Sequence, residues 1–70
     1  MDNQETITDG MNMIRSDIAK DLDTLKDLVA VTKPPVVQEL ILAQRALEDA
    51  RMRIGVARTL LKGENPYGGV

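Results

Sequence analysis

The second half of the chain carries the clearest hydrophobic pattern. Between residues 40 and 62, apolar or small residues recur at alternating steps of three and four. They are Leu40, Ala43, Leu47, Ala50, Ile54, Ala57 and Leu61. This spacing places them along one side of an α-helix and is typical of a coiled-coil seam. The sequence therefore predicts a helix whose seam packs against another helix.

A second apolar line follows the other side of the same segment. It consists of Leu42, Ala46, Val56 and Leu60, and Asp49 and Arg53 interrupt it. A helix with two apolar sides needs two neighbours, so we expect this helix to contact more than one partner.

A third line of the segment is basic. It consists of Arg51, Gly55, Arg58 and Lys62, which places three cations around a position without a side chain. Residues at offsets of four, seven and eleven share one side of a helix. This line is the strongest candidate for binding chemistry.

The first half of the chain has the pattern of an ordinary amphipathic helix. Its apolar residues are Met11, Ile14, Ile18, Leu22, Leu25 and Val29, with charged residues between them. The pattern predicts a helix over about residues 8–30 that Thr6 or Thr8 caps. Residues 1–6 have no such period, and we expect a flexible arm there.

Pro34 and Pro35 separate the two helical segments. Proline ends a preceding helix and is accepted in the first turn of a following one, so Thr32 or Lys33 is the expected cap of a second helix over about 34–62. This helix should be the longer one, and Gly63 should end it in the left-handed conformation, before a tail over 63–70. A short link makes the helices antiparallel neighbours. The predicted fold is a single all-α domain over 1–70, a two-helix antiparallel hairpin.

The size and composition of the chain add an oligomer to this prediction. Below about 70–80 residues a single core rarely gives more than roughly 3–5 kcal/mol of stability. The chain has 70 residues and contains no cysteine or histidine, so neither a disulfide nor a Cys/His zinc site can supplement the core. We therefore expect the hairpin to assemble into a helical homo-oligomer.

The charge and hydropathy of the chain narrow its location and its partners. The net charge of −2 disfavours binding to a nucleic acid polymer, which usually requires a basic domain. No apolar run approaches the ~18 residues of a membrane span, and the polar start is unlike a signal peptide. We expect a cytoplasmic protein without a membrane partner.

The basic line has two interpretations. Arg51, Arg58 and Lys62 are solvated surface charges, or they form an anion site in which arginine binds phosphate oxygens in pairs. Gly55 fits close packing of a helix as well as access for a ligand. Arg53 within the second apolar line requires Asp49 or a ligand phosphate as its partner if that line is buried.

Three further candidates lie near the C-terminal end. Thr59 can donate its hydroxyl group to an anion or to its own preceding turn. Tyr67, the only aromatic residue, can stack on a base or pack on a helix end, and Asn65 can be a turn residue or contact a base.

Catalytic signals are missing from the sequence. It has no histidine or cysteine, no glycine-rich phosphate loop and no carboxylate cluster beside a base. We therefore expect no enzyme activity, no cofactor and no metal site.

Residues 45–69 suggest a family. They read RALEDARMRIGVARTLLKGENPYGG, and they resemble the C-terminal hairpin helix and tail of the phage anti-CBASS and anti-Thoeris sponge proteins, which share a helical hairpin domain. The similar elements are Ala50-Arg51-Met52-Arg53, Gly55-Val56-Ala57 and Asn65-Pro66-Tyr67. The match covers about a third of the chain, and the first helix resembles the family only in its pattern. The chain is short for the anti-Thoeris branch.

The resemblance implies a function without catalysis. Members of the family are homo-oligomers, often hexamers, which sequester cyclic oligonucleotides or cyclic ADP-ribose isomers of bacterial defence in pockets between subunits. By similarity, Arg51, Arg53, Arg58 and Thr59 would hold phosphates, and Asn65 and Tyr67 would contact base or ribose. The expected role is that of a phage anti-defence protein in the infected bacterial cell.

Two other functions fit the same residues. A structural or adaptor hairpin would use the second apolar line to bind a different protein. A nucleic-acid-binding regulator would use the basic end of the second helix, which the negative net charge disfavours.

Overall fold

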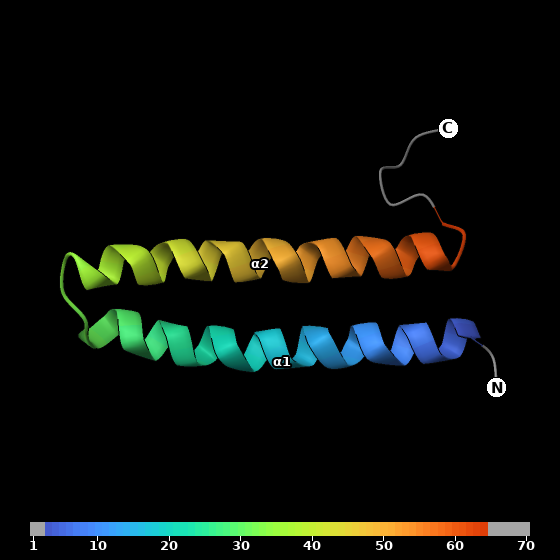
Figure 1. Cartoon of the computed structure of the whole chain (residues 1–70), viewed down its shortest axis with the longest axis horizontal. Coiled ribbons are helices and arrows are strands. Elements are labelled where there is room, and N and C mark those ends of the chain that lie inside the picture. The colour runs from blue at the N-terminus through green and yellow to red at the C-terminus, as the bar shows by residue number, and fades with distance from the viewer. Residues whose placement is uncertain (1–2, 65–70) are drawn as a thin grey trace.

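The chain folds into two long helices that lie side by side and antiparallel (Figure 1). The computed structural model describes residues 3–64, and within that range it contains two helices and no strand. Helix α1 spans Asn3–Val31 and helix α2 spans Val36–Leu61. The two-helix hairpin is thus confirmed. Neither described helix has the length and apolar character that crossing a membrane requires.

Helix α1 begins five residues earlier than its hydrophobic period predicts. Residues 3–6 of the expected flexible arm are helical, and residues 1–2 lie outside the described range. The Gln4 side-chain amide donates a hydrogen bond to the Leu61 carbonyl oxygen at 2.9 Å, which joins the start of α1 to the end of α2. Thr8 donates its hydroxyl to the Gln4 carbonyl from within the helix, so Thr6 and Thr8 are not its caps. With 29 residues against 26, α1 is also the longer helix, contrary to expectation.

The start of α2 differs from the prediction as well. Pro34 and Pro35 form the turn, and Pro35 is the N-cap without a side-chain cap hydrogen bond. Thr32 does not cap α2, because its hydroxyl donates to the Leu28 carbonyl in the last turn of α1. The prolines thus precede α2 instead of lying in its first turn, and the helix begins at Val36.

The end of α2 follows the predicted glycine signal. Gly63 has a φ of +83°, the left-handed conformation that glycine adopts without strain. Its amide donates to the Leu60 carbonyl at 3.0 Å, and the Glu64 amide donates to the Thr59 carbonyl at 3.2 Å. These two bonds form a Schellman motif, which satisfies carbonyl groups at the helix end.

The contact between the helices contains little buried surface. Only Ile18 and Leu25 of α1 are buried among the described residues, with 8% and 9% of their surface exposed. From α2, the apolar seam residues Leu40, Leu47, Ile54 and Leu61 are half-buried. The alanines Ala43 and Ala57 of the predicted seam are exposed instead. The surface of α2 that faces α1 is therefore rotated away from these alanines and toward the basic line.

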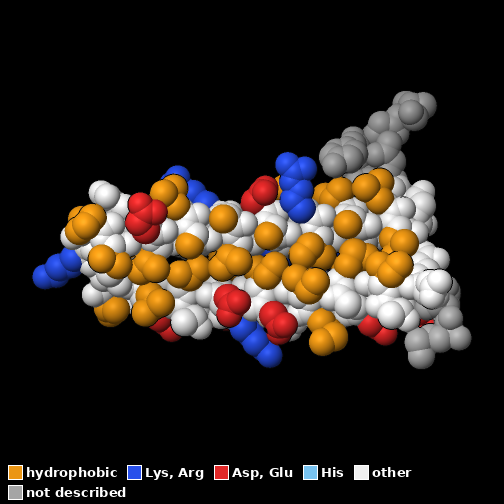
Figure 2. Space-filling view, viewed as in Figure 1, with side chains coloured by type: hydrophobic (Ala, Val, Ile, Leu, Met, Phe, Trp, Pro, Cys, Tyr) orange, Lys and Arg blue, Asp and Glu red, His pale blue; other side chains and the backbone are white. Residues whose placement is uncertain are grey.

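One side of the hairpin exposes a continuous apolar surface, which we call the apolar face. Figure 2 shows it as a band of hydrophobic side chains along the junction of the helices, with acidic and basic residues at its margins. From spacing and exposure it comprises Ile7, Ile14, Leu28, Ala43, Ala50 and Ala57, of which all but the half-buried Ala50 are exposed. On α1, the exposed Asp21 lies between Ile14 and Leu28 on this line. A contiguous exposed apolar surface is typical of a site that contacts a partner.

Candidate functional site

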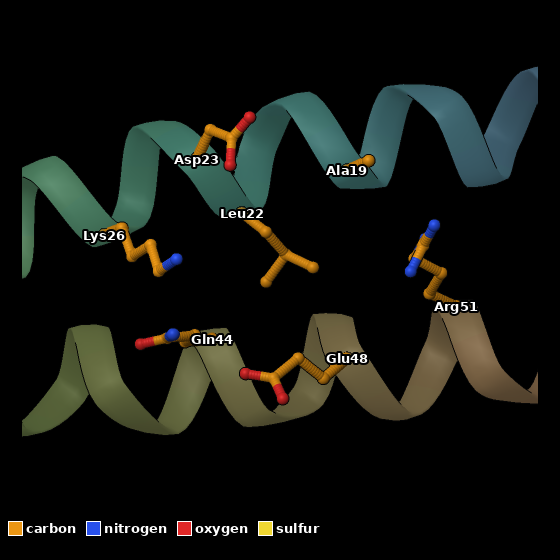
Figure 3. Close-up of a pocket in the computed structure, with 7 residues that line it drawn as sticks. All are labelled: Ala19, Leu22, Asp23, Lys26, Gln44, Glu48 and Arg51. Atoms are coloured by element: carbon orange, nitrogen blue, oxygen red, sulfur yellow. The ribbon is translucent and has the colours of Figure 1, made fainter.

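A charged groove runs between α1 and α2 on the side opposite the apolar face. Figure 3 views the hairpin after a half-turn about its long axis relative to Figure 1, with α1 now above α2. The groove holds two neighbouring cavities of about 440 and 380 Å³. Their lining residues are Arg15, Ala19, Leu22, Asp23, Lys26, Gln44, Glu48, Arg51 and Met52. These volumes fall within the range of roughly 300–1,000 Å³ that is usual for small-molecule sites.

Helix geometry explains why the two sides differ. Each residue advances about 100° around a helix, and on α1 the buried residues Ile18 and Leu25 mark the centre of the contact with α2. Ile14 and Leu28 lie on one flank of this contact, whereas Ala19 and Lys26 lie on the other. Each side of the hairpin therefore has its own composition although the same two helices form both.

Of the site residues predicted from the sequence that lie within residues 3–64, only Arg51 lines the groove. It is an exposed residue of α2, it contributes to both cavities, and its side chain reaches toward α1 (Figure 3). Lys26 of α1 lines the first cavity, and its amino group points into the space between the helices. Cations from both helices thus point into one groove.

Arg15 of α1 is a groove residue that the sequence interpretation missed. Its Nε donates a hydrogen bond to the Arg51 carbonyl oxygen at 3.3 Å, and the residue lines the second cavity. A signal for it exists, because Arg15 lies seven residues before Leu22 and fourteen before Val29, on a line that faces α2. A charged residue on such a line marks the place where the contact changes from apolar to polar.

Gly55 of α2 lies next to the side chain of Arg15 of α1. A Cβ atom added at Gly55 would be 3.6 Å from the Arg15 guanidinium, which is ordinary van der Waals contact. The space beside Gly55 is thus occupied by the Arg15 side chain, and an alanine could replace the glycine without a clash.

Arg58 belongs to the contact between the helices and does not line the groove. Its Nη1 donates a hydrogen bond to Asn12 Oδ1 at 2.7 Å, and the residue is half-buried. Asn12 is a second polar residue of this contact that the sequence interpretation did not identify. Together with Arg15, it makes the contact polar toward the end of the hairpin where α1 begins and α2 ends (Figure 1).

Arg53 lies away from the groove and pairs with Asp49. The Arg53 Nε and Asp49 Oδ2 atoms are 3.9 Å apart, and the two side chains are 70% and 61% exposed. This is the partner that the structural interpretation of Arg53 predicts. At such exposure the pair contributes little to stability.

The remaining predicted residues do not join Arg51 in the groove. Thr59 donates its hydroxyl group to the Gly55 carbonyl at 3.1 Å, which is the bond to the preceding turn. Lys62 is the exposed C-cap of α2. Asn65 and Tyr67 lie outside the described residues.

Acidic residues and an amide complete the groove. Glu48 lines both cavities, and Asp23 and Gln44 line the first. Among residues 3–64, the only ion pair with an N–O distance below 4.0 Å joins Arg53 and Asp49. The charged residues that line the groove therefore form no ion pair with each other at that distance. No group of three or more His, Cys, Asp or Glu residues in this part of the chain could hold a metal ion. The groove therefore offers separate cationic and anionic groups to a ligand.

Comparison of the sequence and structure with protein-family models, curated proteins and solved structures gave no match.

Proposed function

We propose that this chain is a homo-oligomeric binding protein that sequesters a cyclic nucleotide without cleaving it. Its role would be that of a phage anti-defence protein, which removes a signal of bacterial immunity. The observation that carries the proposal is the convergence of Arg15 and Arg51, from different helices, on one groove of ligand size. The resemblance of residues 45–69 to the sponge proteins supplies the class of ligand and the biological setting.

The arginines supply the chemistry that phosphate requires. A guanidinium group is planar, remains charged and donates to two phosphate oxygens at once. The hydrogen bond from Arg15 to the Arg51 backbone restrains the first side chain before any ligand binds. A restrained donor loses less conformational entropy on binding, which favours affinity.

The apolar face supports assembly of several copies. A hairpin with only Ile18 and Leu25 buried among residues 3–64 has a small core for its length. Covering Ile7, Ile14 and Leu28 with a second copy would add apolar burial at about 25 cal/mol per Å². Assembly also suits a sponge, because nanomolar binding requires about −12 kcal/mol, and an open groove gains enclosure when another subunit covers it.

An adaptor that binds a different protein is the second candidate. The observation that favours it is the same apolar face, which could receive an amphipathic helix of another protein. If the chain is an adaptor, the charged groove binds no nucleotide. The two proposals therefore differ in what Arg51 does.

The experiment is calorimetric titration of the purified chain with cyclic dinucleotides, cyclic trinucleotides and cyclic ADP-ribose isomers. We expect one class to bind at a fixed ratio per chain, and Arg51→Glu to abolish the binding. Arg45→Glu is the matched control, because it reverses the same charge at an exposed position that does not line the groove. Arg58 is unsuitable for this test, since its loss would also remove the bond to Asn12.

Two results would contradict the proposal. One is the absence of binding across the whole panel, which would favour the adaptor. The other is equal loss of binding in Arg51→Glu and Arg45→Glu, which would indicate an effect of overall charge.

A further inference from the structure

Glu48 has a position in the groove that phosphate binding does not explain. It lines both cavities beside Arg51, yet it has no ion-pair partner within 4.0 Å among residues 3–64. Its sequence neighbour Asp49 is the acid that pairs, with Arg53. A carboxylate here repels a phosphate, so a ligand that contacts both Arg51 and Glu48 would need a second, different group beside its phosphate.

Three side chains of α2 form a row in the groove. Gln44, Glu48 and Arg51 are spaced by four and three residues, which places an amide, a carboxylate and a guanidinium along one side of the helix. In Figure 3 the Glu48 carboxylate extends toward Gln44, whereas the Arg51 side chain reaches toward α1. The row therefore has a part that accepts hydrogen bonds and a part that binds anions.

The bases of nucleotides differ in how they fit this row. Guanine presents two adjacent donors, N1–H and the N2 amino group, which match the two oxygens of one carboxylate. It also presents the O6 acceptor, which an amide N–H can reach. Adenine presents its N6 amino group beside the N1 acceptor, whose lone pair opposes a carboxylate. Bidentate bonds to an ionised group are the stronger and more selective kind.

We propose that Glu48 and Gln44 select a guanine base, while Arg51 and Arg15 bind the phosphate attached to it. Glu48 accepts hydrogen bonds from guanine N1–H and N2–H, and the Gln44 amide donates to O6. This inference rests on the proposed function and narrows its ligand to cyclic nucleotides that contain guanine.

The test compares two ligands that differ only in their bases. Cyclic di-GMP and cyclic di-AMP are titrated into the full chain, into Glu48→Gln and into Asp49→Asn. We expect the wild type to bind the guanine ligand about tenfold tighter or more, as a good bidentate contact to a base allows. Glu48→Gln should remove this preference without weakening the binding of cyclic di-AMP. Asp49→Asn, which removes the same charge one residue away and outside the groove, should retain it.

The outcomes separate this inference from the proposed function. Binding of both ligands without preference, or a preference that survives Glu48→Gln, overturns the role of Glu48 and leaves the sponge function standing. If no cyclic nucleotide of the panel binds the wild type, both proposals fail. Circular dichroism of each variant verifies that its helices remain formed. Glu48→Ala tests the same contact with no polar group in place of the carboxylate, and it should remove the preference as well.

Discussion

The two sides of this hairpin come from the same two helices and differ completely in chemistry. The apolar face exposes Ile7, Ile14 and Leu28 beside a line of alanines, whereas the groove on the other side presents arginine, lysine and acidic side chains. Both sides are accessible because the contact between the helices buries so little. Two helices packed side by side can thus present two chemically different surfaces, one on each side of their contact.

The largest expected effect tests the contact that separates the two sides. Ile18→Ala should lower the free energy of unfolding by roughly 2–4 kcal/mol, because it removes packed atoms from one of the two buried positions. Urea unfolding at a fixed protein concentration, followed by circular dichroism, measures the loss. Val31→Ala is the control, because Val31 is 79% exposed at the end of α1 and should cost little. Equal losses in both variants would place the core elsewhere.

The next effect concerns the apolar face. Ile14→Glu should weaken self-association by roughly 1.5–3 kcal/mol per copy, the value of burying such a side chain. Sedimentation velocity measures it as a fall in particle mass. The matched control is Met13→Glu, which introduces the same charge at the adjacent, 67% exposed position outside the apolar face. An unchanged mass for Ile14→Glu would mean that this face is not the interface.

A smaller effect tests the packing in the polar half of the contact. Gly55→Ala should raise stability by up to ~1 kcal/mol, since alanine favours a helix and its Cβ fits 3.6 Å from the Arg15 guanidinium. Thermal unfolding measures the gain, and ligand binding should persist. Gly10→Ala, where nothing lies within 4 Å of the added Cβ, should give a similar gain. A loss of stability at Gly55 alone would show that the site is more crowded than the structure indicates.

The smallest effect concerns the exposed ion pair. Arg53→Ala should change the free energy of unfolding by no more than about 0.5 kcal/mol, because both side chains are largely exposed and 3.9 Å apart. A double-mutant cycle with Asp49→Ala isolates the pair. A coupling well above this value would mean that another subunit covers the second apolar line.

The sequence predicts the elements of this fold better than their ends. Period and turn chemistry identify two helices, and Gly63 marks the end of α2 because a left-handed residue is a local requirement. The start of α1 could not be predicted from local signals, since the contact between Gln4 and Leu61 joins residues far apart in the sequence. Likewise, Pro34 and Pro35 predict a turn but do not indicate at which residue the next helix begins.

The candidate site was predicted only in part for a related reason. Three lines of α2 can each face a partner, and their composition alone did not show that Arg51 and Arg58 turn toward α1. Arg15 was missed because it comes from the other helix and enters the groove only through the register of the hairpin. The role of Glu48 depends on the same register.

Native mass spectrometry of the wild-type chain with the cyclic nucleotide panel tests the division between the two sides most directly. We expect particles whose mass is a multiple of the 7.7 kDa chain, each with an integral number of one nucleotide that is released unchanged on denaturation. A single chain of 7.7 kDa without bound nucleotide would contradict it.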